Sequence, residues 1–94
     1  MSRPRKDPEQ VRIENFQKAV AHSQVDAGMP KLKNLSDATG IPYATLWRRI
    51  DDPDKLTVEQ LRSIIDVIGV DPAAVLELVG YSRKESLRVL EHYA

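Results

Sequence analysis

The sequence predicts an all-α fold, a compact domain of five helices with room for a sixth at the C-terminal end. Apolar residues recur at helical spacing in every segment, and no stretch alternates apolar and polar residues as a strand would. Cap residues, prolines and glycines divide the chain into short segments. Its 94 residues suit one domain, expected over residues 7–80, with residues 1–6 forming a basic flexible arm and residues 81–94 a C-terminal helix or tail.

The first helix is expected from residue 8 to about residue 25. Asp7 is a good N-cap, Pro8 suits the first helical position, and Gln10 stands three residues after the cap, where its side chain can reach back. A stripe of apolar residues follows at helical spacing: Ile13, Phe16 and Val20.

Two short helices separated by a tight turn follow. Gly28-Met29-Pro30 ends the first helix, and residues 31–39 predict a second, without a clear N-cap. Gly40 can adopt the positive φ that ends a helix, Ile41 supplies an apolar plug, and Pro42 suits the first position of a third helix. Two short helices joined by such a turn are typical of a helix-turn-helix, in which the second helix lies in the DNA major groove.

Three more helical segments complete the chain. Thr57 and Gln60 predict a capping box, followed by a broad apolar face that ends at Gly69: Leu61, Ile64, Ile65 and Ile68. Asp71-Pro72 predicts a fifth helix with Val75, Leu76 and Val79 on its apolar side, closed by Gly80. Ser82 and Glu85 predict the start of a sixth helix, with Leu87 and Leu90 on its apolar side. This helix could pack on its own chain, pair with a second copy or form a frayed tail.

Residues 16–78 resemble the lambda repressor-like, Cro/C1-type helix-turn-helix family. The resemblance rests on the order and spacing of three motifs: Tyr43-Ala44-Thr45-Leu46-Trp47-Arg48-Arg49-Ile50 running into Asp51-Asp52-Pro53, then Leu56-Thr57-Val58-Glu59-Gln60-Leu61, then Ile68-Gly69-Val70. Ser36 stands where the family usually has Ala, and Pro42 where a Ser or Thr cap is common. The resemblance implies a lambda repressor-like fold that binds duplex operator DNA, with transcription regulation in a phage, prophage or bacterium.

The third helix carries most of the candidate DNA contacts. Leu46 and Ile50 are expected to face the core, which turns Ala44 and Arg48 outward. Arg48 suits a bidentate contact to guanine or a phosphate, against the alternative of a solvated arginine, and Ala44 suits a thymine methyl.

The neighbouring residues of this helix and the N-terminal arm complete the set of candidate contacts. Tyr43 suits a phosphate or base edge or partial burial in the core, and Trp47 suits either the sugar-phosphate wall or a groove between helices. Thr45 and Arg49 suit phosphate contacts. Arg3, Arg5 and Lys6 predict a basic arm that follows phosphates or enters the minor groove, with an inert tail as the alternative.

The charge is distributed unevenly although the chain is neutral overall. Residues 1–50 hold nine Lys and Arg against five Asp and Glu, and residues 51–94 hold five against nine. The helix-turn-helix therefore lies in the positive half, which favours DNA over an accidental scatter of charge. A homodimer is expected, since many operator-binding proteins match the twofold symmetry of their sites.

Other functions find little support in the sequence. There is no Cys, His22 and His92 lie far apart, and no phosphate loop or metal spacing occurs, so no catalysis, cofactor, metal or small-molecule substrate is expected. The cluster Asp51, Asp52 and Asp54 reads as a solvated turn rather than a cation site. No long apolar run suggests a signal peptide or membrane span, which predicts a soluble cytoplasmic protein. The alternative function is an antitoxin or adaptor of the same fold that binds a protein partner through its acidic half.

Overall fold

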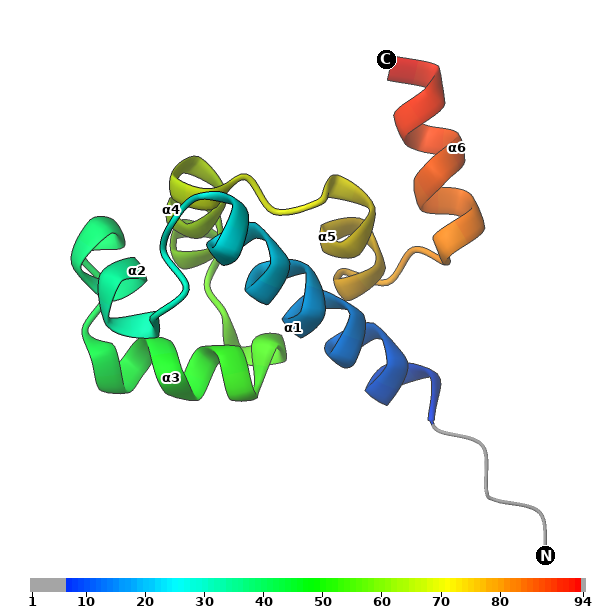
Figure 1. Ribbon diagram of the computed structural model, residues 1–94. Coiled ribbons are helices and arrows are strands. Elements are labelled where there is room, and N and C mark those ends of the chain that lie inside the picture. The colour runs from blue at the N-terminus through cyan, green and yellow to red at the C-terminus, as the bar shows by residue number, and fades with distance from the viewer. Residues whose placement is uncertain (1–6, 94) are drawn as a thin grey trace, which may run out of the picture.

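The computed structural model describes residues 7–93, and these residues confirm the all-helical class. The elements in chain order are α1 (Pro8–Asp26), α2 (Leu32–Thr39), α3 (Tyr43–Asp51), the short 3₁₀ helix η1 (Pro53–Lys55), α4 (Val58–Ile68), α5 (Pro72–Leu78) and α6 (Arg83–Tyr93) (Figure 1). No strand occurs between residues 7 and 93. The sixth helix expected at the C-terminal end is therefore formed.

The helix starts follow the predicted cap chemistry. The Asp7 carboxylate accepts a 3.0 Å hydrogen bond from the Glu9 N–H, and Asp71 caps α5 in the same way. Thr57 and Gln60 form the reciprocal capping box at the start of α4. Gln10 behaves differently from the prediction, because its amide donates along the helix to Glu14 and not back to the cap. Each satisfied cap removes orphan N–H groups that a helix start otherwise leaves unpaired.

One hydrophobic core joins the first four helices. Its innermost side chains, shielded from solvent, come one from each helix: Phe16, Leu35, Leu46 and Ile64. Burial of a side chain of this size contributes roughly 1.5–3 kcal/mol to stability. α1 packs against α4, α5 and η1, while α2 packs against α3 and α4. The core therefore holds α2 and α3 to the rest of the domain.

The pair α2 and α3 and the C-terminal helix α6 lie on opposite sides of the molecule (Figure 1). In Figure 1, α2 and α3 form one side, α1 crosses the middle, and α6 stands at the far side. α6 packs mainly against α5, which in turn packs against α1. The outer face of α3 is therefore left uncovered by α6.

The apolar faces predicted for α5 and α6 are partly wrong. Val79 is 62% exposed and Leu87 46% exposed, whereas Ala73, Ala74 and Glu77 are buried in α5 and Ser86 is buried in α6. The two alanines turn their small side chains inward on α5, and a small side chain allows a neighbouring helix to approach closely. Ser86 satisfies its buried hydroxyl by donating to the Ser82 carbonyl at 2.9 Å. Among residues 7–93, no helix combines the length and apolar character needed to cross a lipid bilayer.

Candidate nucleic-acid interface

The turn between α2 and α3 is closed by three side chains. Gly40 ends α2 with a φ of 77°, and its N–H donates to the Ser36 carbonyl. Ile41 is buried as the predicted plug, and its carbonyl accepts a 2.6 Å bond from the Ser36 hydroxyl. The Thr39 hydroxyl donates to Leu35 and accepts from the Ile41 N–H. These bonds pair the N–H groups of Gly40 and Ile41 and the Ile41 carbonyl, which restrains the angle between the two helices.

The start of α3 lies one residue later than predicted. Pro42 has extended backbone, with φ −53° and ψ 139°, and is the N-cap and not the first helical residue. Its carbonyl already accepts the first helical bond, from the Leu46 N–H at 2.8 Å. No side chain caps this end, nor the start of α2 at Lys31. The N–H groups at both starts lack side-chain acceptors, and such helix ends favour anions.

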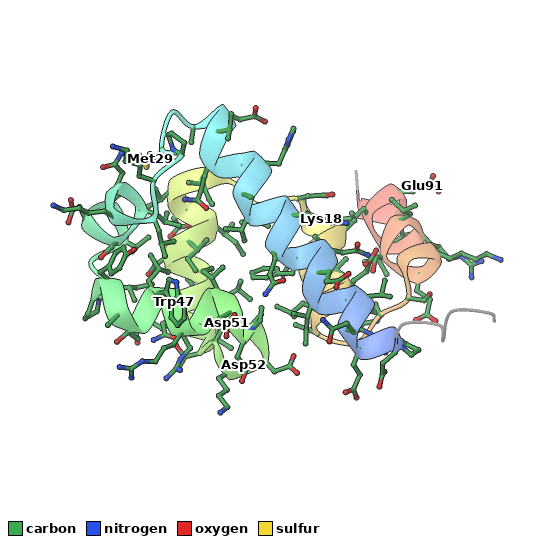
Figure 2. All side chains as sticks on the ribbon, turned by 60° about the horizontal axis from the view of Figure 1, so that its bottom comes forward. Lys18, Met29, Trp47, Asp51, Asp52 and Glu91 are labelled. Carbon is green, nitrogen blue, oxygen red and sulfur yellow. The ribbon has the colours of Figure 1, made fainter. Side chains whose placement is uncertain are left out.

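The outer face of α3 presents two large aromatic side chains and a guanidinium. Tyr43 is 53% exposed and Trp47 is 56% exposed, while Ala44 and Arg48 are also exposed and Leu46 is completely buried. Tyr43 is therefore not part of the core. Trp47 lies near the middle of α3, with Asp51 and Asp52 farther along toward its C-terminal end (Figure 2).

The two neighbouring arginines of α3 differ in their surroundings. Arg48 is exposed, whereas Arg49 is half-buried. The Arg49 Nε is enclosed and has no hydrogen-bond partner among the described residues. A partly enclosed guanidinium is restricted in the directions it can take, so Arg49 is held closer to the body of the domain than Arg48. Thr45 is half-buried beside it on the same helix.

A glutamine on α1 contacts the C-terminal end of α3. The Gln17 Nε2 donates to the Ile50 carbonyl at 2.9 Å and to the Asp51 carbonyl at 3.3 Å. The same side chain lines a hollow of about 310 Å³ with Leu32, Trp47 and the end of α3. Sequence reasoning misses this residue, because Gln17 stands 33 positions before Ile50 and belongs to no motif.

The charge around the two helices is positive. Residues 31–51, from the cap of α2 to the last residue of α3, carry four Lys and Arg and two Asp, a formal charge of +2. Asp51 ends α3, and Asp52 follows directly and is paired with Lys55 at 3.7 Å. Of the acidic residues around the two helices, two lie at the C-terminal end of α3 and one, Asp37, lies on α2.

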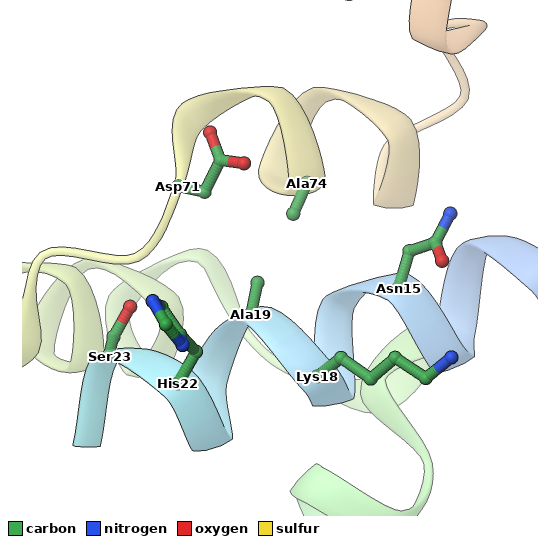
Figure 3. A pocket seen from close by; sticks show the side chains of 7 residues that line it. All are labelled: Asn15, Lys18, Ala19, His22, Ser23, Asp71 and Ala74. Atoms are coloured by element: carbon green, nitrogen blue, oxygen red, sulfur yellow. The ribbon is translucent and has the colours of Figure 1, made fainter. Parts of the chain in front are cut away.

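A second hollow, of about 380 Å³, lies between α1 and α5 (Figure 3). Its polar lining includes Lys18, His22 and Asp71. The Asp71 carboxylate caps α5. The His22 Nε2 lies 3.4 Å from the Asp26 Oδ2 on the same helix. Within residues 7–93, no group of three or more potential metal ligands comes together.

The structure brings six of the predicted site residues onto one helix. Tyr43, Ala44, Thr45, Trp47, Arg48 and Arg49 all belong to α3, while the predicted contacts Arg3, Arg5 and Lys6 lie outside the described residues. No protein-family model, curated protein or solved structure matches this chain.

Proposed function

We propose that this chain binds duplex DNA sequence-specifically by laying α3 in the major groove, and that it regulates transcription as a homodimer. The proposal includes a lambda repressor-like arrangement of the helices and a cytoplasmic site of action in a bacterium or phage-infected cell. The observation that carries it is the exposed face of α3. That face presents Tyr43, Ala44, Trp47 and Arg48 to solvent, while Leu46 of the same helix is buried.

The chemistry of that face suits base reading. An exposed guanidinium can donate two hydrogen bonds to the N7 and O6 of guanine, and a small methyl side chain fits beside a thymine methyl. Arg48 and Ala44 are four residues apart and so lie one above the other on the helix. We assign base contacts to this pair of residues.

The residues on either side of Ala44 and Arg48 suit contacts to DNA phosphates. Thr45 and the restrained Arg49 lie beside the base-reading pair, and the start of α2 offers uncapped N–H groups next to Lys31 and Lys33. Contacts of this kind set the position of a protein on DNA without reading sequence. Arg3, Arg5 and Lys6 would add further phosphate neutralisation.

A selection experiment tests the proposal directly. The full chain is incubated with a random pool of duplexes, bound DNA is amplified, and the enriched sequence is compared with a scrambled duplex in a mobility-shift assay. We expect an enriched near-palindrome with half-site centres about 34 Å apart, and binding at least 10³-fold tighter than to scrambled DNA. Failure to enrich any sequence would overturn the proposal.

An alternative function has one specific observation in its favour. The C-terminal part of the chain exposes Val79, Tyr81 and Leu87. A separate apolar hollow of about 310 Å³ is lined mainly by side chains of α5 and α6, among them Val75, Leu76, Val89 and Leu90. Exposed apolar residues of this kind suit a protein partner. A chain that enriches no DNA sequence but is retained by a protein partner through its C-terminal part would be an adaptor or antitoxin.

A further inference from the structure

We infer that Gln17 of α1 is a positioning residue for α3, holding the C-terminal end of this helix at the angle at which its outer face can read bases. The inference rests on the proposed function, since it concerns how α3 would be presented to DNA. It adds a residue that does not itself contact DNA.

The bonds from Gln17 meet a specific need of the backbone. The last carbonyls of a helix lack N–H partners one turn further on. Here the chain turns into η1 directly after α3, so no further helical turn follows to pair with the last carbonyls of α3. The carbonyls of Ile50 and Asp51 accept the two bonds from the Gln17 amide.

The two bonds from Gln17 hold the C-terminal end of α3, so this helix is attached at both ends. The N-terminal end is held by the closed turn, where Ser36 bonds to Ile41. α3 has only nine residues, and its direction is set by these attachments together with the buried Leu46, the packing of Ile50 on the core and the contact with η1. Loss of the Gln17 bonds would remove one of these restraints at the C-terminal end and allow a small pivot of the helix about its start.

A pivot of this kind would affect base reading more than general DNA affinity. Arg48 lies in the last turn of α3, close to the carbonyls that Gln17 holds. Base contacts require a side chain to be placed within a fraction of an ångström, whereas phosphate attraction tolerates movement. Gln17 therefore controls discrimination between sequences.

The test uses Gln17→Met, which fills similar space but cannot donate a hydrogen bond. The matched control is Gln24→Met, because Gln24 also lies on α1 and also donates to a backbone carbonyl, that of Met29, far from the C-terminal end of α3.

Two quantities are measured on the full chain: the ratio of affinities for the selected and scrambled duplexes, and the fluorescence anisotropy of Trp47. Trp47 is the single tryptophan of the chain and shares the hollow with Gln17. Thermal melts establish that each variant is folded at the temperature of measurement.

We expect Gln17→Met to reduce the affinity ratio roughly three- to tenfold, the effect of losing a typical hydrogen bond, while binding to scrambled DNA stays within about twofold. Trp47 anisotropy should fall, and Gln24→Met should change neither quantity. An unchanged ratio overturns the inference even if Trp47 becomes more mobile, because Gln17 would then be merely structural. If the wild-type chain shows no sequence preference, the proposed function fails, and the inference falls with it. In that case the Trp47 anisotropy still shows whether Gln17 holds α3. It therefore distinguishes failure of the proposed DNA binding from failure of the role assigned to Gln17.

Discussion

Ser36 of α2 and Ile41 of the turn are joined by a 2.6 Å hydrogen bond from the serine hydroxyl to the isoleucine carbonyl. Both residues are buried. The bond pairs a carbonyl that lies after α2 has ended and before α3 begins, where helical hydrogen bonds cannot reach it. Ser36 thus serves two purposes, because its small side chain lets the helices approach and its hydroxyl satisfies the turn.

Substitution of Ser36 should therefore show two different costs. Ser36→Ala keeps the close approach but leaves the Ile41 carbonyl without this donor, so we expect a loss of about 1 kcal/mol in the free energy of unfolding. Ser36→Leu also forces a larger side chain between the helices, and we expect a further loss of about 1–3 kcal/mol. Urea denaturation followed by circular dichroism measures both.

Ser63 of α4 provides the matched control. Its hydroxyl donates to the Glu59 carbonyl within its own helix, and the side chain is half-buried. Ser63→Ala should change stability by less than about 0.5 kcal/mol, because the Glu59 carbonyl also accepts a helical bond. Equal effects at the two serines would contradict the role assigned to Ser36.

The two arginines of α3 should respond differently to truncation. Arg48→Ala should cost about 1–3 kcal/mol on the selected duplex and much less on scrambled DNA, because a base contact is lost only where the matching base is present. Arg49→Ala should weaken binding to both duplexes alike. It should also reduce the slope of log affinity against log salt concentration by about one.

Mobility-shift titrations at several salt concentrations separate these outcomes. Lys18→Ala is the control, since Lys18 is exposed on α1, beside the hollow between α1 and α5. Equal losses on both duplexes for Arg48→Ala would reassign Arg48 to a phosphate.

The helices could be predicted because their ends are encoded locally. The Thr57–Gln60 capping box, the Asp71-Pro72 start and the positive φ of Gly40 each depend on residues within a few positions of one another. Helical periodicity likewise identified Phe16, Leu46 and Ile64 as core residues. The exposed face of α3 followed from the burial of Leu46, since residues two positions away on a helix point elsewhere.

The contacts between distant segments could not be predicted in this way. Gln17 meets Ile50, and Asn15 meets Glu77 across 62 positions, and neither pair is marked by any local pattern. The orientation of α6 is likewise not encoded locally, because Leu87 and Ser86 are neighbours and only packing against α5 decides which of them is buried. A stripe of leucines indicates that a helix has an apolar side, without indicating how that side is turned.

The contact between Asn15 and Glu77 should contribute to stability. Glu77 is almost completely buried, and its carboxylate accepts a 3.0 Å hydrogen bond from the Asn15 amide. Asn15→Ala removes a donor from a buried carboxylate, so we expect the free energy of unfolding to fall by about 1–3 kcal/mol. Asn34→Ala, at an exposed position of α2, should change it by less than about 0.5 kcal/mol. Similar denaturation midpoints for the two variants would show that the Asn15 bond contributes nothing measurable.

The C-terminal helix should stabilise its own chain and also carry the proposed dimer contact, and two variants separate these roles. A chain ending at Tyr81 loses the packing of α6 on α5, including the buried Ser86, so its melting temperature should fall.

Leu87→Glu alters only an exposed side chain and should leave the melting temperature of the monomer unchanged while weakening self-association and operator binding. Val25→Glu places the same charge on an exposed apolar position of α1 and should alter neither. Sedimentation over a range of concentrations measures the association, and a full-length chain that stays monomeric throughout, also on its operator, would rule out the dimer.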